Sequence, residues 1–179
     1  MFELFVTLLS AFVYPFLHVA NAWIFSFLEV TPHVGLIYLP AFLRLLNVLV
    51  LGKVRGTLAT ALGGMFLMLV FGDHSEVGFL NVLCSAAGPL LAVLVFRFYT
   101  GRDVQLQSLK DLGFVTLGYC MANAIVHHLV WMLFDPRQLV VPQQLLWMML
   151  GDFNGALMGA YALKWAASRF NIGDPTQRS

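Results

Sequence analysis

Two charged side chains, Arg44 and Asp152, lie inside long apolar runs of a sequence that is 60% hydrophobic and only 11% charged. A charged side chain at mid-bilayer is costly, so each of these residues needs a partner or a role. Counted along a helix from the predicted outer end of each apolar run, Arg44 lies about 15 Å deep and Asp152 about 12 Å deep. Because the depths match, we expect an Arg44–Asp152 ion pair. Asn47 and Asn154 would support this pair, which we interpret as a structural clamp in preference to a catalytic group. In the alternative, each charge pairs separately with backbone or water.

Further polar side chains fall at the same depth in other apolar runs. They are His18 and Asn21 early in the chain, then Asn81, and finally Asn123, His127 and His128. Such a cluster would suit a cavity that opens outward and holds a small ligand. It would equally suit a buried hydrogen-bond network that only joins helices, and the sequence leaves both interpretations open. The candidate site is therefore the set His18, Asn21, Arg44, Asn47, Asn123, His127, Asp152 and Asn154.

The same residues bear on catalysis and cofactors. His127 and Asp152 could act as an acid–base pair, but no nucleophile–base arrangement is evident, so we expect no enzyme. His18 with His127 or His128 could ligate a haem from two helices, yet no four-helix pattern of paired histidines occurs. No Cys/His metal spacing occurs either, so we expect neither a cofactor nor a metal site.

The elements that must position these residues are transmembrane helices. A soluble domain carries about 25% charged residues, more than twice the share found here, and the mean hydropathy is +0.82. A span needs roughly 20 apolar residues, and six stretches fit: Leu4–Leu28, His33–Leu51, Gly56–Gly72, Gly78–Tyr99, Leu112–Phe134 and Gln144–Leu163. The predicted fold is therefore all-α, a polytopic helical bundle with one transmembrane domain over residues 1–170 and a short cytoplasmic tail over 171–179.

The distribution of charge predicts the orientation of this bundle. Cytoplasmic loops are enriched in Lys and Arg, and an inside amino terminus places eight basic residues on that side: Lys53, Arg55, Arg97, Arg102, Lys110, Lys164, Arg169 and Arg178. Only Arg137 falls outside, with the acidic residues Glu29, Asp73, Glu76 and Asp135. We therefore expect both termini in the cytoplasm. The formal net charge of +1 gives no electrostatic reason for a nucleic-acid partner.

Two other patterns concern packing and the membrane edges. Gly151, Gly155 and Gly159 form a four-residue repeat that permits close helix approach, within the protomer or, as the alternative, at a homodimer seam. We favour packing within the protomer. Tryptophans mark the predicted edges, where they would anchor the helices: Trp23, Trp131 and Trp147 at the outer edge and Trp165 at the inner.

A series of short motifs extends over most of the chain. It comprises Leu39-Pro40, Leu49-Val50-Leu51-Gly52-Lys53, Gly63-Gly64, Ala86-Ala87-Gly88-Pro89-Leu90-Leu91 before Arg97, Leu109-Lys110-Asp111-Leu112, and Trp147 with Gly151-Asp152 and Gly155. In this order of features the chain resembles the first family of bacterial membrane-associated sensor domains (MASE). These are polytopic modules found ahead of histidine kinases and cyclic-di-nucleotide enzymes. The resemblance implies a stand-alone relative in the bacterial inner membrane that acts through another polypeptide, with Pro40 and Asp152 as important positions.

Three functions remain open at this stage. The first is a sensor-like or accessory membrane subunit that binds a membrane or cytoplasmic partner protein and a small ligand. The second is the substrate-binding component of an energy-coupling-factor transporter, since six helices in a chain of this length also resemble that class. The third is a structural or assembly subunit of a larger membrane complex, whose neighbours would cover its apolar surface.

Overall fold

The computed structural model describes residues 1–31, 34–71, 75–134 and 141–169 of the chain. Six α-helices occur in these ranges: α1 (Phe2–Phe25), α2 (Pro40–Leu51), α3 (Lys53–Phe71), α4 (Glu76–Thr100), α5 (Leu109–Phe134) and α6 (Pro142–Arg169). A 3₁₀ turn, η1 (Ser26–Leu28), follows α1, and the strands β1 (Glu29–Thr31) and β2 (Val34–Gly35) form a short antiparallel pair. The predicted all-helical class is confirmed, although the small strand pair was not expected. The predicted tail, 171–179, lies outside the described residues.

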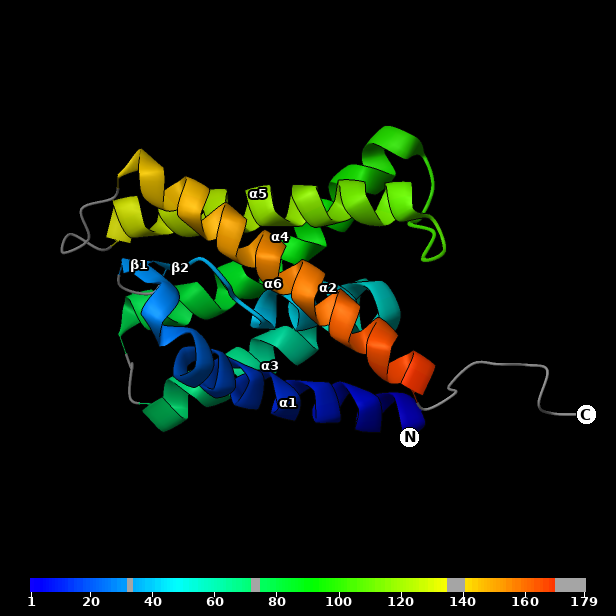
Figure 1. Ribbon diagram of the computed structural model, residues 1–179, viewed down its shortest axis with the longest axis horizontal. Helices are drawn as coiled ribbons and strands as arrows, with labels where there is room; N and C mark the ends of the chain where they lie inside the picture. Colours follow the sequence, from blue (N-terminus) through cyan, green and yellow to red (C-terminus); the bar gives the residue numbers. More distant parts are fainter. Residues whose placement is uncertain (32–33, 72–74, 135–140, 170–179) are drawn as a thin grey trace, which may run out of the picture.

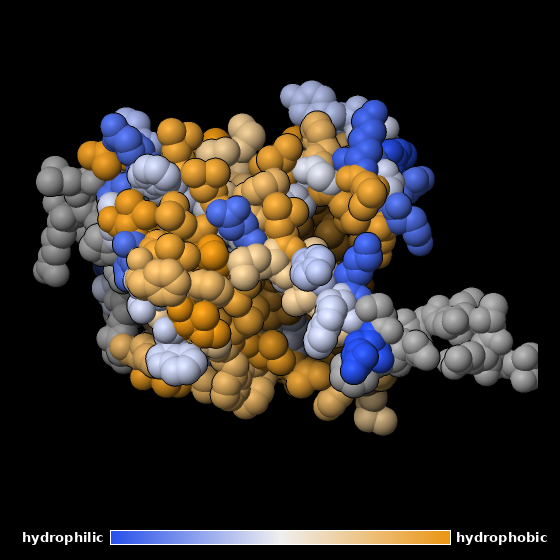
Figure 2. Space-filling model, viewed as in Figure 1, coloured by the Kyte–Doolittle hydropathy of each residue, from blue (hydrophilic) through white to orange (hydrophobic). Residues whose placement is uncertain are grey.

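Four of the helical stretches are long and apolar enough to cross a membrane: Phe2–Leu28, Lys53–Phe71, Glu76–Thr100 and Leu109–Phe134. Their outward surfaces carry large apolar side chains, among them Phe12, Phe16 and Leu117, each more than half exposed. Figure 2 shows apolar side chains covering most of the visible middle of the molecule. Soluble monomers seldom expose so continuous an apolar surface, so the structure agrees with the membrane class that composition predicts.

The second predicted span, His33–Leu51, is not one continuous helix. Its helical part is α2, which has only 12 residues and begins at Pro40. Proline suits the first position of a helix, where its missing N–H is not needed. The helix ends at Leu51. Gly52, whose φ of +83° favours glycine, follows it, and α3 begins at Lys53. Residues 34–39 thus enter the bundle as β2 and irregular chain.

Helix α2 lies in the middle of the bundle and contacts α1, α3, α4 and α6. Around it, α1 packs on α3, α4 packs on α5, and α6 crosses the front of the molecule in Figure 1. One buried apolar cluster joins α2, α4 and α5 through Leu45, Phe96 and Tyr119, among others. The short helix is therefore held from several sides by longer ones.

The glycines of α6 pack against the segment that leads into α2. A methyl group at Gly151 would meet the carbonyl oxygen of Gly35, and one at Gly155 would meet that of Tyr38. At Gly159 it would meet the Phe42 ring. The stripe Gly151, Gly155 and Gly159 therefore packs within the protomer, as we favoured.

Close approach also lets neighbouring helices satisfy the backbone of residues 36–39. The Tyr38 N–H donates to the Gly151 carbonyl oxygen at 3.0 Å, and Asn154 Nδ2 donates to the Leu36 carbonyl oxygen at 2.9 Å. The Leu39 N–H donates to Asn21 Oδ1 at 2.8 Å. Non-helical backbone at membrane depth is tolerated only where protein or water satisfies it, and here α1 and α6 provide the partners.

The start of α1 and the end of α6 lie at the same end of the molecule (Figure 1). Ion pairs gather there: Arg55 with Glu3, Lys53 and Arg97 with Asp103, and Arg102 with Asp111. The Asp111 carboxylate receives two hydrogen bonds from Arg102, which raises the pKa of that guanidinium. We call this end, with Lys110, Lys164 and Arg169, the basic end. Arg137, Arg178, Asp73 and Asp135 lie outside the described residues.

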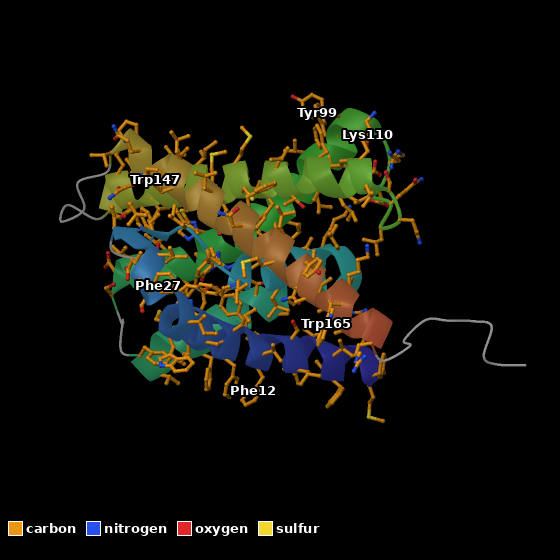
Figure 3. All side chains as sticks on the ribbon, viewed as in Figure 1. Phe12, Phe27, Tyr99, Lys110, Trp147 and Trp165 are labelled. Atoms are coloured by element: carbon orange, nitrogen blue, oxygen red, sulfur yellow. The ribbon has the colours of Figure 1, made fainter. Side chains whose placement is uncertain are left out.

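Aromatic side chains mark both ends of the bundle. Tyr99 and Trp165 lie toward the basic end with Lys110, whereas Trp147 and Phe27 lie toward the opposite end (Figure 3). Trp165 is 60% exposed and Trp23 is 83% exposed. The role of Trp23, Trp147 and Trp165 as anchors at the membrane edges stays a prediction.

Candidate functional site

Arg44 of α2 is buried between two tyrosines. Its Nε and Nη2 both donate to the Tyr14 hydroxyl of α1, at 2.9 and 2.5 Å, and Nη2 also donates to the Tyr38 hydroxyl at 2.9 Å. The guanidinium carbon stands 5.4 Å from the Tyr14 ring centre and 4.9 Å from that of Tyr38. Cation–π attraction at these distances adds to the hydrogen bonds. Two neutral side chains thus hold this charge.

Asp152 of α6 is 1% exposed and accepts a 2.6 Å hydrogen bond from Asn123 Nδ2 of α5. Arg44 and Asp152, both within the described ranges, form no ion pair with each other. The predicted direct pair is therefore wrong: Arg44 Nε and Nη2 donate to tyrosine hydroxyls, and Asn123 donates to one oxygen of the Asp152 carboxylate. Each charge is held separately, as the alternative stated, though by side chains in place of backbone or water.

Both charges nevertheless face one cavity. Its volume is about 510 Å³, and its polar wall includes His18, Asn21, Asn81, Ser85, His127, Arg44 and Asp152. Phe25, Glu29, Phe71 and Gly78 also line it. Because α1 and α3 end near these residues and α4 begins there, the cavity reaches the end of the bundle opposite the basic end. The predicted site residues His18, Asn21, Arg44, His127 and Asp152 thus meet in one space.

The other predicted site residues belong to hydrogen bonds outside the cavity wall. Asn47 accepts a hydrogen bond from Ser10 at 2.5 Å and donates to Thr60 at 3.4 Å, which joins α1, α2 and α3. Asn123 supports Asp152, and Asn154 holds the Leu36 carbonyl. Asn47 and Asn154 therefore do not support an Arg44–Asp152 pair. The polar cluster is therefore both a cavity and a structural network: some of its residues line the cavity, and the others hold helices and chain segments together.

The adjacent histidines of α5 differ in their surroundings. His127 Nδ1 lies 2.9 Å from the Asn123 carbonyl oxygen, and Nε2 lies 3.4 Å from Ser85 Oγ. A carbonyl oxygen only accepts, so Nδ1 carries a proton, and in the neutral ring Nε2 accepts from the serine. His128 bonds to the Ala124 carbonyl oxygen through Nδ1 at 2.8 Å and is not among the residues lining the cavity.

Trp131 is part of the cavity wall and not a membrane-edge anchor, which corrects our expectation for this residue. It is 4% exposed, and its Nε1 donates to Asn81 Oδ1 at 2.8 Å. Both His127 and His128 contact its ring. An indole buried in this way usually has a hydrogen-bond partner, and Asn81 is that partner.

His18, Cys84 and Cys120 are the other histidine and cysteine side chains in the described ranges. No three His, Cys, Asp or Glu side chains gather there closely enough to hold a metal ion. His18 Nδ1 lies 3.1 Å from the Tyr38 hydroxyl. Cys84 and Cys120 are free and buried.

The sequence-based prediction missed the two tyrosines that hold Arg44. Tyr14 precedes His18 by four residues and Asn21 by seven, so all three lie on one face of α1. Asn81 and Ser85 on α4 repeat the four-residue spacing, as do Asn123 and His127 on α5. Polar residues at this spacing in an apolar helix mark the inward face. That signal would have found Tyr14, whereas Tyr38 lies in irregular chain that no periodicity describes.

Searches of protein-family models, curated proteins and solved structures found no significant match to this chain.

Proposed function

We propose that this chain is a sensor-like membrane subunit that binds a small ligand and acts through a partner protein. The observation that carries the proposal is the cavity, which brings buried Arg44 and Asp152 together with His18 and His127. A concave site with a few convergent polar groups in apolar walls is the usual form of a small-molecule site. The proposal places the chain in a bacterial inner membrane with six spans, both termini inside and the cavity open to the outside.

The position of α2 supports coupling between the two ends of the bundle. Arg44 lies in the cavity wall, and the helix runs from there to Gly52 and Lys53 at the basic end. Lys53 pairs with Asp103 of the loop between α4 and α5, and the same aspartate pairs with Arg97. A ligand that moves α2 would therefore disturb contacts at the basic end, where a partner would be docked. The resemblance to membrane-associated sensor domains supports the same view.

Burial of the small residues on α3 weighs against the transport alternative. Vitamin-binding subunits of energy-coupling-factor transporters use such residues on their first and third helices to dock a coupling subunit. Here Ala59 is fully buried, and a methyl group at Gly63 would meet Ala11 and Tyr14 of α1. Gly64 faces Val82 of α4 in the same way. The small residues of α3 thus pack against α1 and α4 of the same chain and do not form a surface on which a coupling subunit could dock.

Site-specific photo-crosslinking tests where a partner binds. A photoreactive residue replaces Lys110 at the basic end or, as the matched control, Glu76 at the opposite end; both positions are exposed. We expect the Lys110 position to capture a histidine kinase or a cyclic-nucleotide enzyme in native membranes, and the Glu76 position not to. Capture of an ATPase with a coupling protein, or of subunits of a redox complex, would reject the sensor proposal.

Blocking the cavity tests whether its occupancy matters to that partner. Ala22→Trp places a large ring at a lining position of α1, and Val19→Trp places the same ring on the same helix outside the lining. We expect Ala22→Trp to change the activity of the captured partner and Val19→Trp to leave it unchanged. If the two variants give the same partner activity, occupancy of the cavity does not control the partner, and this part of the proposal is wrong.

A further inference from the structure

The cavity holds two opposite charges that have no charged partner in contact. Arg44 on α2 is 4% exposed and donates hydrogen bonds to the hydroxyls of Tyr14 and Tyr38, and its Nη1 has no hydrogen-bond partner among the described residues. Asp152 on α6 is 1% exposed and is held by the neutral amide of Asn123. A buried charge without a counter-ion is strongly unfavourable. Both residues line the same wall without pairing, so a ligand could supply both counter-ions.

We propose that this cavity binds a small zwitterion of the amino-acid type, with its carboxylate toward Arg44 and its ammonium group toward Asp152. This inference rests on the proposed function and names its ligand class.

The arrangement of charge selects against simpler ions. A carboxylate alone, placed beside Arg44, would also approach the negative charge of Asp152. An amine alone would approach Arg44 when it reached Asp152. A zwitterion carries both groups, adds no net charge to a site whose two buried charges already cancel, and gives each a partner. Specificity of this kind comes from repulsion of the wrong ligand as much as from attraction of the right one.

The remaining wall suits the rest of such a molecule. Phe25, Phe71 and Trp131 supply apolar surface for a side chain. The volume of about 510 Å³ falls within the range of about 300–1,000 Å³ typical of small-molecule sites. Other titratable groups that face the cavity are Tyr14, Tyr38, His18, His127 and, at the exposed mouth, Glu29.

Thermal unfolding of the full chain in detergent tests the ligand class. Each of the twenty common L-amino acids is added singly at millimolar concentration. The best binder is then compared with its deaminated acid and its decarboxylated amine. We expect at least one amino acid to raise the melting temperature, and each analogue to bind on the order of tenfold or more weakly. If no amino acid shifts the midpoint, or if either analogue binds as well as its parent, the zwitterion proposal is overturned.

Charge-neutralising variants should change which ligand is preferred, whereas misfolding would weaken the binding of every ligand. Asp152→Asn removes the repulsion of an anion, so we expect it to lose the zwitterion preference and to bind the deaminated acid at least as well as the amino acid. Arg44→Gln should shift preference toward the amine. Leu157→Ala, a 52% exposed position on α6, is the control and should keep the parent preference. If Asp152→Asn keeps a folded profile and the parent preference, the assignment of the ammonium group is wrong.

The two proposals fail separately. Absence of amino-acid binding, together with a changed partner activity in Ala22→Trp, would reject the zwitterion and leave the sensor function standing. Binding of an amino acid with no effect of Ala22→Trp on the partner would reject the sensor function and keep the ligand.

Discussion

The Tyr14 hydroxyl accepts two of the hydrogen bonds that Arg44 makes in the interior. Replacing Tyr14 by Phe keeps the ring beneath the guanidinium but leaves Nε without its acceptor. Hydrogen bonds to charged groups contribute about 1.5–3 kcal/mol each, so we expect Tyr14→Phe to lower the free energy of unfolding by roughly that amount. Unfolding by SDS in mixed micelles measures it. Tyr161→Phe, at a side chain that is 73% exposed, should be unchanged; equal midpoints for both variants would contradict the role of the Tyr14 hydroxyl.

Asn123 is the only described side chain that hydrogen-bonds the Asp152 carboxylate. Asn123→Ala leaves a buried acceptor unsatisfied, which costs about 1–3 kcal/mol. The same SDS titration should show this loss. Ile125→Ala provides the control, since Ile125 lies on the same helix with 42% of its surface exposed. A loss in Ile125→Ala as large as that in Asn123→Ala would indicate general weakening of α5 instead of a specific contact.

The gathering of polar residues was predictable because a buried polar side chain in lipid needs partners at its own depth. The depth of a residue in the membrane, however, gives its position along only one direction. It cannot tell which helices are neighbours or what stands between two residues at one level. For this reason His18, Asn21, Arg44, His127 and Asp152 were correctly grouped, whereas the Arg44–Asp152 pair was wrong. The intervening tyrosines could be placed only once α1 and the start of α2 were side by side.

Among the elements, α6 is distinguished by glycines that let another backbone lie directly on it. At Gly155 a methyl group would meet the Tyr38 carbonyl group and the Leu39 nitrogen, which are backbone atoms that cannot rotate away. We therefore expect Gly155→Ala to lower stability by about 1–3 kcal/mol, as overpacking does. Gly113→Ala on α5 is the matched control, because nothing lies within 4 Å of its added methyl group. Since alanine favours helix by about 1 kcal/mol over glycine, Gly113→Ala should be neutral or stabilising; a Gly155→Ala that behaves alike would refute the close contact.

The existence of most helices followed from hydropathy, but the break within His33–Leu51 did not. An extended apolar segment and an apolar helix have the same hydropathy, and the choice between them depends on backbone partners. Residues 36–39 avoid the helix because α6 and Asn21 satisfy their N–H and carbonyl groups. Two of these partners, Gly151 and Asn154, lie more than 100 residues farther along the chain, so no local sequence pattern could indicate them. Pro40 was a local sign that a helix could start there.

At the scale of the whole molecule, charge is distributed unequally between the two ends. Ion pairs involving Lys53, Arg55, Arg97 and Arg102 gather beside the start of α1, whereas Glu29 and Glu76 lie toward the other end. If basic residues mark the cytoplasmic face, this asymmetry fixes which way the cavity opens. Orientation therefore decides whether the ligand comes from outside the cell.

Cysteine labelling in intact cells tests this orientation. Gln107→Cys introduces an exposed thiol in the loop between α4 and α5, and Glu76→Cys introduces one at the opposite end. The native Cys84 and Cys120 are buried and should react little. With a membrane-impermeant maleimide we expect Glu76→Cys to be labelled in intact cells and Gln107→Cys only after permeabilisation. The reverse pattern would place the cavity mouth in the cytoplasm, and the ligand would then be an internal metabolite sensed from within.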